Sequence, residues 1–258
     1  MNNLVYIDTH CHLNDEAFDE DRDEVVKKAQ ANGITAIIDS SIDYATGLKS
    51  LELQSKFPGF VFSSLGFEPA LIDDEEFHLV YELIKQNKDT IIAIGEVGLD
   101  YYRIRDALDQ EKQRFYFQEF IKLAQKLDKP LIVHSRSAGK YALEILFEEA
   151  PNKVMMHAFD GKMFWADKGV KSNFYFSVPT SVWYSKHKIK LARTVPIAQM
   201  LLETDSPVLG PERGMRNEPQ NIHFAAKKIA EIKEMEPTEV IRTTTENAIN
   251  FFNLPIKT

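Results

Sequence analysis

Six side chains of the types that bind metal ions each follow a short apolar run in this sequence. They are His10, His12, Glu96, His134, His157 and Asp205. The runs before them are rich in Val, Ile, Leu and Met, which predicts buried parallel strands. If these strands lie side by side, the six groups meet at one rim. Imidazole suits zinc, and carboxylates also suit magnesium or manganese, so the set predicts a site for one or two divalent ions.

The first two ligands are separated by one residue. On a strand, His10 and His12 therefore point to the same face, and Cys11 points to the opposite face, where we expect it to pack against a helix. The alternative is a pair of hydrogen-bonded core histidines. Four more ligands at matching strand ends make a metal site the better interpretation.

The next three ligands close consecutive apolar runs. Glu96 lies between Gly95 and Gly98, which leave room for backbone, metal or substrate, and its carboxylate is suited to bridge two cations. A buried acid paired with a base is the alternative. His134 and His157 are interpreted as ligands of the second ion, although each alone is also compatible with a structural histidine.

Asp205 follows the last apolar run and is the predicted catalytic residue. Two metal ions lower the pKa of a shared water, so a carboxylate within hydrogen-bond reach acts as its base. We expect Asp205 both to bind the first ion and to activate the metal-bound water. Its alternative role is to cap a helix before Ser206 and Pro207.

The elements that must position these residues form a regular alternation. Predicted strands are 4–8, 35–39, 60–65, 91–94, 131–133, 154–156, 174–178 and 200–203. Amphipathic patterns between them predict helices, among them 15–32, ended by Gly33, and 110–127. The pattern favours a TIM-type (β/α)8 barrel over a doubly wound sheet, because no glycine-rich dinucleotide loop follows the first strand. We expect the tail, 218–252, to form two helices outside the barrel.

Composition sets limits on the class of protein. With 258 residues, of which 44% are hydrophobic, one barrel domain over 1–258 is expected. A single cysteine and an N-terminus without a signal-like segment predict a cytoplasmic protein. No run reaches the roughly 18 apolar residues of a membrane span. The net charge of −8 argues against a broad basic face, although phosphate can still bind through metal ions. Nothing indicates an obligatory protein partner.

Several motifs carry a resemblance to a known family. They are DTHCHL (8–13), AIGEVGLDYY (93–102), VHSR (133–136), HAFDG (157–161), ETDSP (203–207) and RNEP (216–219). In this order they resemble the TatD family of metal-dependent hydrolases, and HSRSAGK, HAFDG and TDSPVLGPE are most similar to its TatD-domain-containing protein 3 branch. The resemblance implies a TIM-type barrel, a divalent metal centre, and DNase activity that is often exonucleolytic. It places metal ligation on the six residues identified above.

One position departs from that family. Where the family usually has G-x-H-P, this chain has Glu68 in the stretch 66–69. A carboxylate repels phosphate unless a cation lies between them. Either Glu68 recruits a third cation and contacts the substrate, or the natural substrate is not an ordinary nucleic-acid end. The alternative is that Glu68 turns to solvent or to a nearby arginine.

Other residues are weaker candidates for substrate binding. Arg136 is suited to bind a phosphate oxygen, and Asp160 to orient a ligand or pair with Arg136. Trp183 and Tyr184 are candidates for stacking a nucleobase, with loop packing as the alternative. The nearby basic residues are interpreted as a solvated helix face. They are Lys186, Lys188, Lys190 and Arg193.

Three functions remain open at this stage. The leading hypothesis is a metal-dependent phosphodiesterase acting on DNA or another phosphodiester. A small-molecule amidohydrolase or esterase is the second, since the same pair of ions polarises a carbonyl. Relatives of that kind often bridge their metals with a carboxylated lysine, whereas this chain has Glu96, which favours the nuclease. A metal-binding protein without turnover is the third, and Asp205 argues against it.

Overall fold

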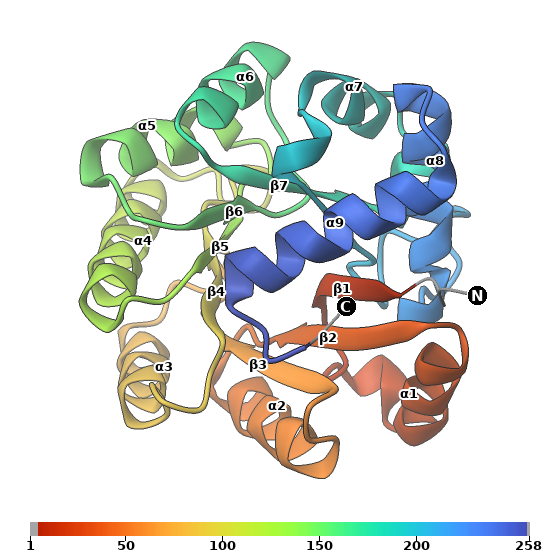
Figure 1. Ribbon diagram of the computed structural model, residues 1–258. Coiled ribbons are helices and arrows are strands. Elements are labelled where there is room, and N and C mark those ends of the chain that lie inside the picture. The colour runs from red at the N-terminus through yellow and green to blue at the C-terminus, as the bar shows by residue number, and fades with distance from the viewer. Residues whose placement is uncertain (1–4, 257–258) are drawn as a thin grey trace.

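Eight parallel strands lie at the centre of the molecule, and their order in the sheet follows their order in the chain (Figure 1). This computed structural model describes residues 5–256. The strands are β1 (Tyr6–Cys11), β2 (Ile34–Ser40), β3 (Val61–Leu65), β4 (Ala93–Gly98), β5 (Leu131–His134), β6 (Val154–Met156), β7 (Tyr175–Pro179) and β8 (Met200–Glu203). Each overlaps one of the predicted strands, and Leu4, the predicted first strand residue, lies outside the described residues.

The first and last strands approach each other and close the ring. The amide of Asp205 donates to the carbonyl of His10 over 2.9 Å, and the amide of His12 donates to the carbonyl of Ser206 over 2.8 Å. Both bonds join the end of β1 to the segment just after β8. The predicted (β/α)8 barrel is therefore confirmed, and its closure occurs next to three of the predicted metal ligands.

Helices surround the barrel, each following the strand of the same number (Figure 1). They are α1 (Arg22–Ala31), α2 (Tyr44–Lys56), α3 (Asp74–Gln86), α4 (Ala107–Leu127), α5 (Gly139–Glu149), α6 (Met163–Lys171), α7 (Lys186–Thr194) and α8 (Ile222–Lys233). A continuous layer of buried apolar side chains lies between them and the strands, and it includes Cys11, as expected for the outward-facing residue of β1. None of the helices in the described range is long and apolar enough to cross a membrane.

The last helix, α9 (Pro237–Phe252), lies across one end of the barrel (Figure 1). Phe251 and Phe252 pack with Ile7 and Leu201 in the cluster that fills the barrel interior. The hydroxyl of Thr245 donates to the carbonyl of Val5, just before β1, so this is the N-terminal end of the strands. The prediction that both tail helices pack outside the barrel is wrong for α9, which closes the end opposite the candidate site.

The segment after β1 differs from the predicted helix over 15–32. A short 3-10 helix, Glu16–Phe18, forms first, and α1 begins only at Arg22. The carboxylate of Asp15 accepts a hydrogen bond from the amide of Ala17, which ties the chain into this first turn. Gly33 does follow the helix with φ +84°, the left-handed stop that the sequence predicts.

Candidate metal centre

The six predicted ligands converge at the C-terminal end of the barrel. A cavity of about 580 Å³, called the metal cavity below, opens there. His10 is fully buried and lies against its wall. The other five line the cavity directly and are His12, Glu96, His134, His157 and Asp205. Their donor atoms form three overlapping groups, each within 4.8 Å. The structure thus brings together in one place every residue of the predicted set.

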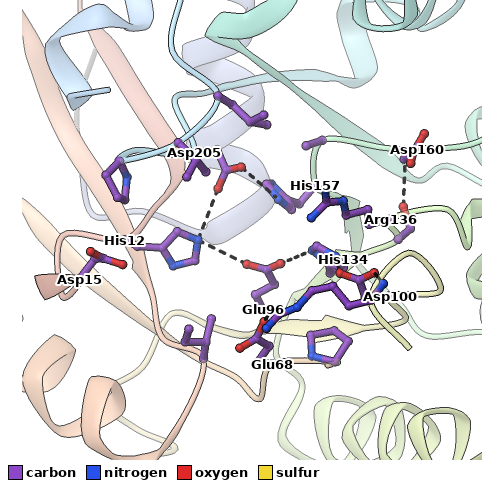
Figure 2. A pocket seen from close by; sticks show the side chains of 18 of the residues that line it. His12, Asp15, Glu68, Glu96, Asp100, His134, Arg136, His157, Asp160 and Asp205 are labelled. Atoms are coloured by element: carbon purple, nitrogen blue, oxygen red, sulfur yellow. Dashed lines mark hydrogen bonds and ion pairs between the residues drawn. The ribbon is translucent and has the colours of Figure 1, made fainter. Parts of the chain in front are cut away.

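Glu96 lies between His12 on one side and His134 on the other (Figure 2). Its Oε2 atom is 3.2 Å from His10 Nε2 and 3.4 Å from His12 Nε2. Its Oε1 atom faces His134 Nδ1 on the other side. The two carboxylate oxygens of Glu96 therefore face different histidines.

The glycines on either side of Glu96 make room for the neighbouring strand. A Cβ atom at Gly98 would lie 2.1 Å from the carbonyl oxygen of His134, and one at Gly95 would lie 2.5 Å from Cβ of Ile132. The sequence analysis expected backbone, metal or substrate beside these glycines. In the structure the space is taken by the backbone of β5. This close approach brings His134 to the Glu96 carboxylate.

Asp205 faces both sides of the cavity as well. Its Oδ1 atom is 3.5 Å from His10 Nε2 and 3.4 Å from His12 Nε2, and its Oδ2 atom is 3.8 Å from His157 Nε2. No helix starts at Ser206 or Pro207, so the alternative helix-capping role is wrong. The residue is buried with φ +55°, and both oxygens point toward imidazoles.

Hydrogen bonds on the far ring nitrogens hold three of the imidazoles in place. His157 Nδ1 donates to Glu203 Oε2 over 2.8 Å, and His12 Nδ1 donates to the carbonyl of Ser40 over 2.8 Å. The Ser40 hydroxyl lies 3.0 Å from His10 Nδ1. Each bond leaves the Nε2 atom directed at the carboxylates, as is usual for imidazoles that bind metal ions.

Three of the ring nitrogens are buried without a hydrogen-bond partner. They are Nε2 of His10 and both ring nitrogens of His134. The carboxylates lie within ion-pair distance of them, but at angles that make no hydrogen bond. Buried polar atoms are rarely left in this state, and unsatisfied imidazole nitrogens beside carboxylates are the donor set of a divalent cation. The residues present therefore fit a metal centre.

The charges in the cavity shift the pKa values in opposite directions. Burial acts against the charged form of both His134 and Glu96, but the attraction between them outweighs it. The pKa of His134 is raised to about 9, and the pKa of Glu96 falls well below its usual range. Burial likewise opposes charge on Asp205, yet His157 and the other imidazoles lower its pKa. The carboxylates thus stabilise positive charge, which protons or metal ions can supply.

Several residues around the ligands escaped the sequence analysis. Asp8, fully buried, accepts from the amide and hydroxyl of Thr204 over 2.9 and 2.6 Å, and so holds the chain before Asp205. Glu203 orients His157, and Asp100 Oδ2 lies 3.4 Å from His134 Nε2. Asp8 and Glu203 are acids within otherwise apolar predicted strands, which is a signal that could have identified them.

Lys188 corrects the interpretation of the basic stretch on α7 as a solvated face. Its ammonium group donates to the carbonyls of Ala158 and Phe159 over 2.5 and 3.1 Å and lines the metal cavity. Burial lowers the pKa of Lys188, and the nearby acids, Asp160 first among them, oppose that effect. The side chain therefore places a cation on the wall beside His157.

Arg136 lines the cavity, as expected for a substrate-binding residue, but it does not pair with Asp160. Its guanidinium group lies over the ring of Tyr102 at 4.0 Å, and no acid in the described part of the chain is within ion-pair distance of it. Asp160 instead accepts from the amide of Ser137 over 2.8 Å. The expected pairing is wrong, and the guanidinium donors are left for another partner.

Glu68 also lines the cavity (Figure 2), and its carboxylate pairs with the guanidinium group of Arg103. The side chain of Glu68 is 29% exposed. The structure therefore agrees with the alternative that Glu68 turns to a nearby arginine. None of the potential metal-binding groups in the described residues contains Glu68. A guanidinium group thus supplies the positive charge that a third cation would provide.

Trp183 and Tyr184 pack against other side chains and are not part of the cavity lining. The Trp183 ring packs against Phe224 at 5.5 Å, and the guanidinium group of Arg213 lies 4.8 Å from the ring of Tyr184. Neither residue lines the metal cavity. These contacts favour loop packing, the alternative interpretation, and base stacking at these residues stays a prediction.

Comparison with known proteins agrees with the motifs. The family described as TatD related DNase matches residues 7–253. The human protein named Deoxyribonuclease TATDN3 is 38% identical, over 95% of this chain and 94% of its own length. The Bacillus subtilis protein named Uncharacterized metal-dependent hydrolase YabD is 36% identical, over 97% of this chain and 100% of its own length.

Solved structures show the same fold. The TatD homologue YJJV from Escherichia coli superposes with a TM-score of 0.88 at 24% identity, covering 97% of this chain and 98% of that one. The family match and the related proteins identify a metal-dependent hydrolase of ester bonds, and the histidines and carboxylates at the C-terminal end of the barrel fit that class. The chain belongs to the TatD related DNase family, as its motifs predicted.

Proposed function

We propose that this protein is a deoxyribonuclease that removes nucleotides from the end of a DNA strand, using two divalent ions. The observation that carries the proposal is the division of the Glu96 carboxylate between His12 on one side and His134 on the other. Support also comes from the human relative, whose name describes a deoxyribonuclease. A bridging carboxylate with two imidazole-rich sides suits a two-metal centre.

The chain offers a separate donor set for each ion. His10 and His12, with Glu96 Oε2 and Asp205 Oδ1, would hold the first. His134 and His157, with Glu96 Oε1, would hold the second. The mixture of imidazole and carboxylate admits zinc, manganese or magnesium. Bound ions supply Lewis acidity and lower the pKa of water.

Asp205 is the base in this proposal. Its carboxylate lies deep in the cavity, directed at both histidine pairs, so it is within reach of a water that attacks the scissile phosphorus. Asp205 would take the proton of that water as the new bond forms. Two hydrogen bonds from Thr204 to Asp8, and the hydrogen bond from the backbone amide of Asp205 to the carbonyl of His10, hold this segment in position.

Cationic side chains on the wall would hold the phosphate oxygens. Lys188 has two of its three donors on carbonyls, which leaves one for an anion in the cavity. Arg136 presents a planar fork whose ring contact with Tyr102 fixes its plane. These two groups give the cavity an anion-binding side, although the whole chain carries a net charge of −8.

The proposal is tested with metal-free protein that is reloaded with zinc, manganese or magnesium. End-labelled single-stranded DNA, the matching RNA and a panel of neutral esters are offered at equal concentration. We expect hydrolysis of DNA, with mononucleotides released from one end from the earliest time points. If neutral esters are hydrolysed and DNA is not, the protein is a small-molecule hydrolase. If fragments of intermediate length appear first, the exonucleolytic part of the proposal is wrong.

A further inference from the structure

A second pocket adjoins the metal cavity. It has a volume of about 610 Å³ and lies at the start of α5, α6 and α7, which are neighbours around the barrel (Figure 1). Asp160 lines both pockets and so belongs to the wall between them. On either side of it, the same three chain segments supply residues to both: Arg136 and Ser137, Ala158 and Gly161, Lys188 and Lys190. Residues close together in the chain therefore line two adjacent pockets, one on each side of Asp160.

The second pocket carries a local excess of positive charge on an acidic protein. Lys140, Lys162 and Lys190 line it from α5, from the residue before α6 and from α7, and all three are exposed. Among its described lining residues, Asp160 is the one acid, and its carboxylate already accepts from Ser137. Lys140 has a partner in Glu144 at 3.7 Å, an exposed pair of the weak kind.

Two aromatic side chains complete the pocket. Tyr141 is 38% exposed and Trp165 is partly exposed, and both line it beside the lysines. Lysine side chains with aromatic faces between them are what binds a single strand of nucleic acid, because the cations contact phosphates and the rings stack bases. An acidic or neutral small molecule would use only half of these features.

We propose that this second pocket binds the part of the strand beyond the two nucleotides that the scissile bond joins, and that it makes the enzyme prefer longer strands over dinucleotides. The inference rests on the proposed function. In this arrangement the scissile phosphate lies in the metal cavity, and the strand continues past Asp160 into the pocket. The lysines contact its phosphates, and Trp165 and Tyr141 contact its bases.

The test compares the metal-loaded wild type with a variant carrying Lys140→Gln, Lys162→Gln and Lys190→Gln. Binding is measured with a fluorescent octathymidylate in phosphorothioate form, which resists hydrolysis, at several salt concentrations. We expect at least about tenfold weaker binding in the variant. The slope of log K against the logarithm of the salt concentration should become shallower by about 0.7 for each lysine that contacts a phosphate. Hydrolysis of dithymidylate should stay within about twofold of wild type, because a dinucleotide does not reach the pocket.

Two further variants separate the site from general effects. Lys85→Gln, Lys88→Gln and Lys126→Gln together remove the same charge from a pocket between α3 and α4, and this control should bind the octamer as the wild type does. Trp165→Leu should weaken binding without changing the salt dependence, since it removes a ring and no charge.

The proposal is overturned if the first triple variant binds the octamer like wild type, or if the control loses as much affinity. Failure of the proposed function gives a different result, namely a metal-loaded wild type that hydrolyses neither the dinucleotide nor an ordinary octamer. Octamer binding that depends on the three lysines in such a protein would still support the strand site.

Discussion

The amide of Asp205 donates a hydrogen bond to the carbonyl of His10 over 2.9 Å, and Oδ1 of the same aspartate lies 3.5 Å from Nε2 of the same histidine. One residue pair therefore joins the first strand to the last and also forms part of the metal site. Because barrel closure and the donor set share these residues, stability and metal binding should change together.

The first prediction follows from that coupling. Ions that bind the folded chain stabilise it by about 2.7 kcal/mol at a hundred times the dissociation constant, which is roughly 5–10 °C in melting temperature for a chain of this size. Calorimetry of the metal-free and reloaded protein measures the shift. The variant Glu96→Gln should show a smaller shift than wild type. An identical melting temperature with and without metal would contradict the coupling between metal binding and stability.

The second prediction concerns the base. Asp205→Asn keeps a ligating oxygen but cannot take a proton, so turnover on DNA should fall by at least about a hundredfold. Metal content is measured on the same sample, because a lost ion would lower turnover for another reason. Near-normal turnover in a fully loaded variant would assign the proton transfer to a different group.

The third prediction concerns the ion pair between Glu68 and Arg103. Glu68→His removes a carboxylate beside the incoming phosphate and frees the guanidinium group, so KM for DNA should fall by about two- to fivefold, the scale of a partly exposed ion pair. Arg103→Gln should raise KM, because the carboxylate then has no partner. Metal content should be equal in both. A loss of metal in Glu68→His would show instead that the carboxylate holds a cation.

The fourth prediction concerns Lys188. Lys188→Met removes the cation from the cavity wall, and kcat/KM on DNA should fall by about ten- to hundredfold, as for a hydrogen bond to a charged group. Lys188→Arg should recover part of that loss. The exposed Lys186 on the same helix supplies the control, and Lys186→Met should act like wild type. If Lys188→Met also loses metal, its role is to hold the loop that carries His157.

The convergence of the six predicted ligands was predictable because a parallel barrel brings the carboxyl ends of all its strands to one rim. The local sequence alone identified some of these candidates: the two histidines between Thr9 and Leu13, and Glu96 between its glycines. The barrel itself was predictable for the same reason, since apolar runs and amphipathic segments alternate along the whole chain.

What remained hidden depends on contacts between distant segments. Lys188 is one of several alternating basic residues, and only the carbonyls of Ala158 and Phe159 distinguish it from a solvated lysine. Glu68 lies 35 residues from Arg103, and helix propensity does not reveal their pairing. The position of α9 depends on the packing of Phe251 and Phe252 against the barrel interior. The local sequence of the helix does not predict that contact.

The most direct test of the two-ion centre is DNA hydrolysis measured against the number of metal equivalents added to metal-free protein. The account predicts that activity rises mainly with the second equivalent, and that the bound metal reaches two per chain. In His134→Ala the bound metal should stay near one, with activity lost, while His78→Ala, an exposed histidine outside the cavity, should act like wild type. Full activity at one equivalent, with no second ion bound, would contradict it.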